Sequence, residues 1–314
     1  MVLRAARRCG GKAAALESKG NACGSLDDPP GLTKVSIFEM PSEFAEQDIA
    51  FLLEGAGPEL LNRIDIIKDD TTFVDSVLES QAPEIVRHVM SNQENIVASI
   101  TPRFLFEAVL RAARKELAAR AYTLERSSTQ RIPVFDTREV LSFIQDDAVL
   151  KYLARMLTSF THIRSFTWPV RVRKGIWRRI RFSDMDVDSL MRYCETVDEA
   201  QRFEHYRRIA DLCLFIVGIF PEYAGFDPGG PGDRRQAITP VRRRRSPEDY
   251  EREGKRFYKL ASEHRDAILL GSSTVLKKMG DGFHLAKKPL NFISERYLDF
   301  TKGRLFPSAA SRLS

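Results

Sequence analysis

The sequence predicts a mainly α-helical protein: an irregular multi-helix bundle with two short β-hairpins and a C-terminal helical subdomain. Three observations favour this fold class. Apolar residues recur at helical spacing over long segments, four candidate helices begin with proline, and two segments alternate in the manner of strands. The 314 residues are 43% apolar, which suffices for a sizeable core in one or two domains.

The first 33 residues have no hydrophobic periodicity and are rich in glycine, so we expect a disordered N-terminal tail over 1–33. This segment lacks the apolar stretch of a secretory signal. An organelle-targeting segment is the alternative, because the first 20 residues contain five basic residues and one acid. The longest apolar run has nine residues, whereas a membrane span needs about 20. We therefore expect no membrane partner.

A helical body is predicted over 34–223. Proline is tolerated in the first turn of a helix, where its missing N–H costs nothing. The clearest helix starts at Pro102, with Thr101 as its cap, and ends near Ala121. Another, from Val197 to Phe220, is apolar nearly all round at its end and should lie at the centre of the core. Further helices are expected over 42–54, 58–68, 71–79, 83–98, 137–145 and 147–160, and from near Asp186.

The hairpins are predicted near 122–135 and 169–182. A flexible linker rich in glycine, proline and arginine should follow over 224–246. The C-terminal helical subdomain, 247–306, is expected to dock on the body, because a unit of about 60 residues is marginal alone. Its helices are predicted over 247–264, 266–280 and 284–301, with Pro289 in a first helical turn, and a short tail follows over 307–314.

The net charge of +6 is unevenly distributed. Residues 164–181 contain seven basic residues and no acid, and residues 227–245 contain six arginines and two acids. With the N-terminal 20 residues, these segments carry +15, which leaves −9 for the remainder. An acidic body with basic segments favours a polyanionic partner.

The hairpin near 169–182 is the most informative part of the sequence. A three-residue loop, 173–175, would pair Val172 with Ile176 and Arg171 with Trp177, and would separate an apolar face from a basic one. A two-residue loop would mix the faces. The basic face would then combine arginines, which match phosphate geometry, with an indole on which a base can stack. The predicted nucleic-acid-binding residues here are Arg171, Arg173, Lys174, Trp177, Arg179 and Arg181.

Two interpretations of this hairpin stay open. It is either exposed and binds DNA or RNA, or it is covered by acidic helices of the same chain. The run Arg242, Arg243, Arg244 and Arg245 would add sequence-independent affinity as a tether, or would simply be a solvated linker.

Candidate catalytic and metal sites are weak. Asp184, Asp186 and Asp188 are better explained as acids at a helix start than as metal ligands. Arg155 and His162 match the loose spacing of helical HEPN-type ribonucleases, which gives an enzymatic alternative. Four cysteines without paired spacing favour reduced thiols and a cytoplasmic location.

These observations predict a non-enzymatic binding protein without metal or cofactor that contacts nucleic acid. The second hypothesis is a helical scaffold that binds an acidic protein or a second copy of itself, and the third is a helical ribonuclease-like enzyme.

Overall fold

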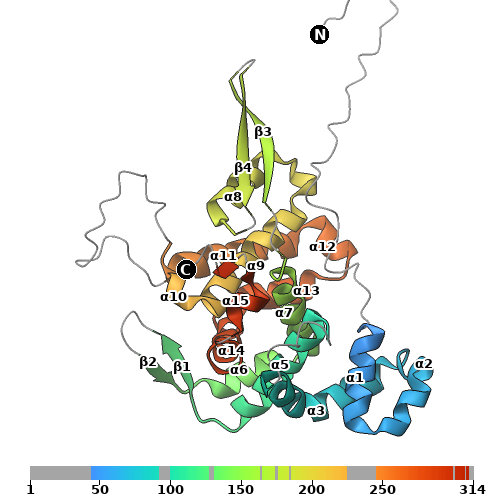
Figure 1. The fold of residues 1–314 in the computed structure, drawn as a ribbon. Helices are drawn as coiled ribbons and strands as arrows, with labels where there is room; N and C mark the ends of the chain where they lie inside the picture. Colours follow the sequence, from blue (N-terminus) through green and yellow to red (C-terminus); the bar gives the residue numbers. More distant parts are fainter. Residues whose placement is uncertain are drawn as a thin grey trace, which may run out of the picture.

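The computed structural model describes residues 44–91, 100–126, 131–162, 165–173, 176–183, 185–224, 245–299, 301–307 and 309–310. Within these ranges the chain is mainly α-helical with two antiparallel hairpins, which confirms the predicted fold class (Figure 1). The predicted tail over 1–33 and nearly all of the predicted linker over 224–246 lie outside the described residues.

The N-terminal part of the fold is helical, and its first helices lie at one side of the molecule (Figure 1). It comprises α1 (Glu46–Ala56), a 3-10 helix (Pro58–Arg63), α2 (Ile64–Ile67), α3 (Thr71–Ser91) and α5 (Pro102–Ala118). As predicted, Thr101 caps α5, and its hydroxyl accepts from the backbone N–H of Phe104 at 3.3 Å. The buried carboxylate of Asp48 in α1 accepts from the N–H and the hydroxyl of Thr101, both at 2.7 Å, and so joins the two helices.

Helix α3 corrects one prediction. Separate helices were expected over 71–79 and 83–98, but a single helix runs through Pro83. A proline inside a helix cannot bond the carbonyl four residues earlier, which here belongs to Glu79. The ammonium of Lys115 in α5 donates to that carbonyl and, at 3.2 Å, to the carbonyl of Ser80. A neighbouring helix thus supplies the donor that Pro83 lacks.

The middle of the chain contains both hairpins and the central helix. Its elements are β1 (Thr123–Arg126), β2 (Arg131–Val134), α6 (Thr137–Ile144), α7 (Asp147–Ser159), β3 (Ser165–Arg173), β4 (Ile176–Ser183), α8 (Val187–Thr196), a short 3-10 helix (Glu199–Gln201), α9 (Phe203–Ile219) and α10 (Pro221–Ala224). The hairpin near 122–135, the helices near 137–145 and 147–160, and the helix from near Asp186 are confirmed. The second hairpin begins four residues earlier than expected.

The C-terminal part comprises α11 (Pro247–Glu263), α12 (Arg265–Leu269), α13 (Ser273–Asp281), α14 (Phe283–Arg296) and α15 (Lys302–Leu305). The helix predicted over 266–280 is broken at Gly271, whose φ of 65° lies in the left-handed region that favours glycine. Pro289 lies inside α14 rather than in its first turn. Burial of this helix from Phe283 to Ile293 outweighs the bond that the proline removes.

Helix α9 lies at the centre of the hydrophobic core, as its sequence predicts. Helices α11 and α14 pack directly on it. Side chains of α14 also satisfy carbonyls in the last turn of α9, which a helix leaves without internal partners. The amide of Asn291 donates to the carbonyls of Val217 and Gly218, and the hydroxyl of Ser294 donates to that of Ile219, all at 2.8 Å.

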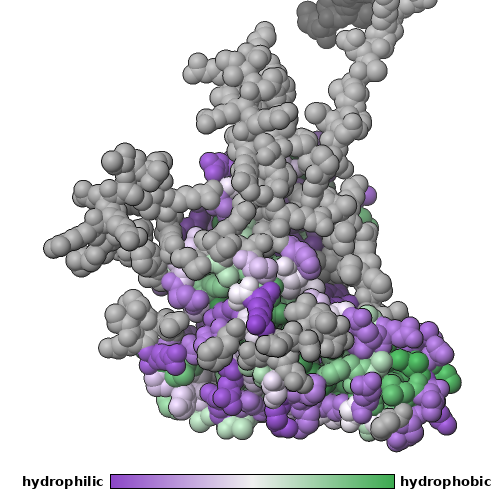
Figure 2. Space-filling view, viewed as in Figure 1, coloured by the Kyte–Doolittle hydropathy of each residue, from purple (hydrophilic) through white to green (hydrophobic). Residues whose placement is uncertain are grey.

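No helix in the described ranges is long and apolar enough to cross a membrane. Apolar atoms on the visible face gather over α1 and α2, where Ile66 is exposed (Figure 2).

Candidate nucleic-acid interface

The backbone of the β3–β4 hairpin gives the register of the predicted basic face. Arg171 lies opposite Trp177, as expected. The expected pair of Val172 with Ile176 is wrong: Ile176 lies opposite Arg173, and an irregularity falls between Arg171 and Arg173. The irregularity in β3 takes up this shift in register, so Arg171 still lies opposite Trp177. Residues 174–175 between the strands lie outside the described residues.

Strand alternation then assigns residues of β3 and β4 to two faces. Pairs at every second position share a face, and the pairs on the basic face are Thr167 with Arg181, Pro169 with Arg179 and Arg171 with Trp177. The pairs on the opposite face are Phe166 with Phe182, Trp168 with Ile180 and Val170 with Arg178. We call the face with Arg171, Trp177, Arg179 and Arg181 the basic face. Arg173 lies beyond the irregularity in β3, and Lys174 lies outside the described residues.

The β3–β4 hairpin projects from the helical body (Figure 1). Apart from the contact between its own strands, its main contact is between β4 and α8 at its base. A two-stranded ribbon of this kind is narrow enough to enter the major groove of DNA.

Of the three acids at the base of the hairpin, Asp186 and Asp188 are bound within the protein, and Asp184 lies outside the described residues. The carboxylate of Asp188 in α8 accepts from the guanidinium of Arg245 at 2.6 Å, and Asp186 accepts from the hydroxyl of Ser189. Burial opposes the charge of Arg245, but the hydrogen bond to Asp188 outweighs it, so the pKa of Arg245 is raised. Arg245 therefore ties the chain before α11 to α8. Its predicted companions Arg242, Arg243 and Arg244 lie outside the described residues.

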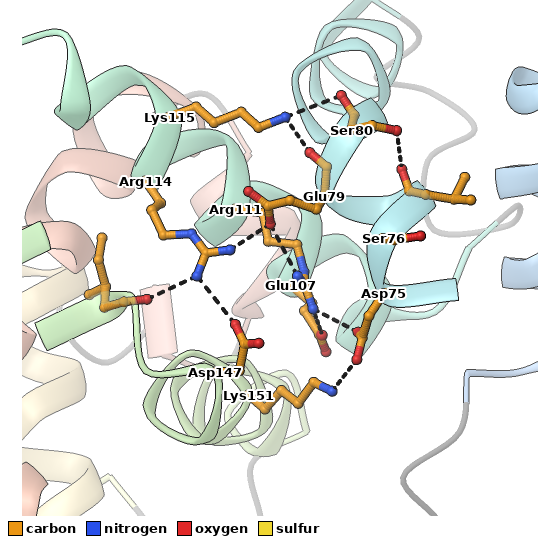
Figure 3. A network of polar contacts seen from close by, with 12 residues as sticks. Asp75, Ser76, Glu79, Ser80, Glu107, Arg111, Arg114, Lys115, Asp147 and Lys151 are labelled. Carbon is orange, nitrogen blue, oxygen red and sulfur yellow. Dashed lines mark hydrogen bonds and ion pairs between the residues drawn. The ribbon is translucent and has the colours of Figure 1, made fainter. Parts of the chain in front are cut away.

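Acids of the helical body are also engaged with cations of that body. The buried guanidinium of Arg111 in α5 contacts carboxylates of Asp75, Glu79 and Glu107 at 2.7, 3.1 and 2.9 Å (Figure 3). Burial alone would lower the pKa of Arg111, but these carboxylates raise it. Lys151 of α7 bonds Asp75 at 2.5 Å, so this network joins α3, α5 and α7.

A second polar cluster lies at the centre of the core, and the sequence did not predict it. The carboxylate of Asp211 in α9 is fully buried and accepts from the hydroxyls of Tyr152 in α7 and Tyr258 in α11, at 2.6 and 2.7 Å. The guanidinium of Arg207 lies 4.0 Å from the other oxygen. Burial raises the pKa of Asp211 and, together with the nearby carboxylate, raises those of both tyrosines well above their ordinary values.

The Asp211 cluster joins α7, α9 and α11, and all three of its hydrogen-bonded side chains are buried. The one available signal was an acid within an otherwise apolar helix, and the sequence does not show which hydroxyls meet it.

The positions of Arg155 and His162 do not support the ribonuclease-like alternative. Arg155 lies within α7 and His162 lies beyond its end, as the sequence indicated. Burial, with the nearby charge of Arg103, lowers the pKa of Arg155. His205 is half-buried against the ring of Tyr193, and this burial lowers its pKa to about 4. The described ranges hold no group of three His, Cys, Asp or Glu side chains arranged to bind a metal ion.

The two described cysteines are free thiols in the core, as predicted. Burial raises the pKa of Cys194 to about 11 and raises that of Cys213 further. Both are therefore unreactive at neutral pH.

Comparison of the chain with protein-family models, with curated proteins and with solved structures finds no match.

Proposed function

We propose that the protein binds nucleic acid through the basic face of the β3–β4 hairpin, as a non-enzymatic protein acting in the cytoplasm. The observation that carries this proposal is the register, because it assigns Arg171, Trp177, Arg179 and Arg181 to one face of a projecting ribbon. Guanidinium groups bind phosphates in a bidentate manner, and an indole stacks on bases.

The distribution of acids supports the same proposal. Covering of the hairpin by acidic helices of the chain would require carboxylates available to its arginines. Among the described residues, Asp188 of α8, the helix that contacts the base of the hairpin, is already bound to Arg245. Arg242, Arg243 and Arg244 would add affinity that does not depend on sequence.

The test is the salt dependence of binding to labelled single- and double-stranded DNA and RNA. Each phosphate contact contributes a slope of about 0.7 to 0.9 in a plot of log affinity against log salt. We expect an Arg171/Arg179/Arg181→Ala variant to lose affinity and to reduce this slope by about two to three.

The matched control removes three exposed arginines elsewhere, as Arg63/Arg87/Arg256→Ala, and so has the same net charge. It should retain most of the affinity. Equal loss in both variants would show that net charge alone attracts the nucleic acid, and absence of binding by the wild type at low salt would contradict the proposal.

A further inference from the structure

The β1–β2 hairpin exposes apolar side chains at an unusual density. Four of the eight large apolar side chains exposed in the described part of the protein belong to this hairpin and its flanks: Tyr122, Leu124, Ile132 and Phe135. Phe135 is 81% exposed. Single exposed apolar residues are ordinary, but a contiguous group marks a surface that another molecule covers.

The register gathers most of this group on one face. Leu124 lies opposite Pro133. Tyr122 and Phe135 lie beyond this pair, at the open end of the hairpin, and their ring centroids are 6.1 Å apart. Leu124 and Pro133 share a face because they are paired, and Tyr122 lies two residues before Leu124 on the same side. The ring contact with Tyr122 brings Phe135 to this side, which we call the outer face. The opposite face meets α14, and Thr123 is buried there. The outer face therefore carries three of the four exposed side chains, and Ile132 is exposed on the opposite face.

The hairpin is fixed in place by one buried cation. The ammonium of Lys288 in α14 bonds the carboxylates of Glu125, at 2.9 Å, and Asp136, and lies 3.4 Å from the hydroxyl of Thr123. Thr123 in turn donates to Asp136 at 2.5 Å. A surface held rigid before binding loses little conformational entropy when a partner arrives.

The charges around the outer face select the kind of partner. Residues 120–139 contain four arginines and three acids, and two of these acids, Glu125 and Asp136, are bound by Lys288. Arg131 and Arg138 are exposed, and Arg131 contacts Glu295 at 3.5 Å. A second copy of this surface would bring arginines against arginines, whereas acidic residues beside an apolar segment would complement them.

We propose that the outer face of β1–β2 binds an apolar segment of another protein that carries acidic residues beside its apolar ones. Phe135 and Tyr122 are the anchors, because large exposed aromatic side chains contribute most of the energy of such contacts. Arg131 and Arg138 provide the charge selection. This site lies away from the basic face of β3–β4 and does not depend on it (Figure 1).

The experiment is selection of peptides from a random phage-displayed library on the full chain, with Phe135→Ser protein as the competitor in solution. We expect the enriched peptides to combine apolar and acidic residues. Individual synthetic peptides should bind the wild type and lose at least tenfold in affinity with Phe135→Ser. They should lose a similar factor with Arg131→Glu/Arg138→Glu.

Leu269→Ser is the matched control, because Leu269 is 70% exposed in α12, outside the hairpin. It should leave peptide affinity unchanged, and circular dichroism should be the same for all variants.

Three results would overturn the proposal. The selection could enrich no peptide whose binding requires Phe135, or only neutral and basic peptides. Sedimentation could reveal a dimer that Phe135→Ser dissociates, which would assign the face to a second copy. Binding of single-stranded RNA that fails with Phe135→Ser but persists with Arg171/Arg179/Arg181→Ala would assign the face to nucleic acid instead.

Discussion

The Asp211 cluster and the outer face of β1–β2 reverse the usual distribution of residues in opposite ways. Asp211 is a carboxylate at the centre of the core, and Phe135 is an aromatic side chain in solvent. The buried acid has its partners inside the chain, namely Tyr152 and Tyr258. The exposed aromatic group lies beside the ring of Tyr122, which is itself exposed. A misplaced polar residue with internal partners indicates a structural role, whereas a misplaced apolar residue without cover indicates an external partner.

The largest loss of stability is expected at the Asp211 cluster. Asp211→Ala leaves two buried hydroxyls without their acceptor and Arg207 without its nearest buried carboxylate. Removal of one member of such a cluster costs about 3 to 5 kcal/mol. Urea denaturation should show this loss in the free energy of unfolding.

The triple variant Asp211→Leu/Tyr152→Phe/Tyr258→Phe is the companion experiment, because it removes the buried polar groups together. It should be closer to the wild type than Asp211→Ala is. If Asp211→Ala unfolds at the same urea concentration as the wild type, the cluster does not join the helices.

An intermediate effect is expected at Lys288, which connects the core to the hairpin. Lys288→Met leaves the carboxylates of Asp136 and Glu125 without their cation and should cost about 2 to 3 kcal/mol. Adding Asp136→Asn and Glu125→Gln to this variant should restore part of the loss. An unchanged urea midpoint in Lys288→Met would contradict the role given to this residue.

The same contact has a pH dependence. Partial burial opposes ionisation of Asp136, but hydrogen bonds from Lys288 and Thr123 outweigh it and hold its pKa below the ordinary value. A lowered pKa in the folded state stabilises the protein above the pKa of the unfolded chain, and this contribution is lost as the pH falls through the folded pKa. The difference in unfolding free energy between the wild type and Lys288→Met should therefore shrink on acidification. A difference that stays constant from neutral pH to pH 3 would exclude this linkage.

The smallest loss of stability is expected at Phe135. Phe135→Ser should change the free energy of unfolding by less than about 0.5 kcal/mol, because the ring loses little contact with the body. Thermal and urea midpoints measure this directly. A loss above about 2 kcal/mol would show that Phe135 is part of the fold and would remove the reason to infer a partner there.

The sequence predicted those features that depend on local patterns. Thr101 as a helix cap, the apolar face of α9 and the pairing of Arg171 with Trp177 all follow from spacing and residue type. Pro83 and Pro289 misled the prediction because contacts distant in sequence override them: Lys115 donates to the carbonyl that Pro83 leaves open, and burial keeps α14 helical through Pro289. Lys288 and Asp211 acquire their roles only when helices far apart in the chain meet.

Trp177 offers the most direct test of nucleic-acid binding by the basic face. The chain contains two tryptophans, Trp168 and Trp177, which the register assigns to opposite faces of the hairpin. In a Trp168→Phe variant, fluorescence reports Trp177 alone. We predict emission typical of a solvated indole that single-stranded nucleic acid quenches at low salt and releases at high salt. Emission typical of a buried indole, unchanged by nucleic acid at any salt concentration, would contradict the claim.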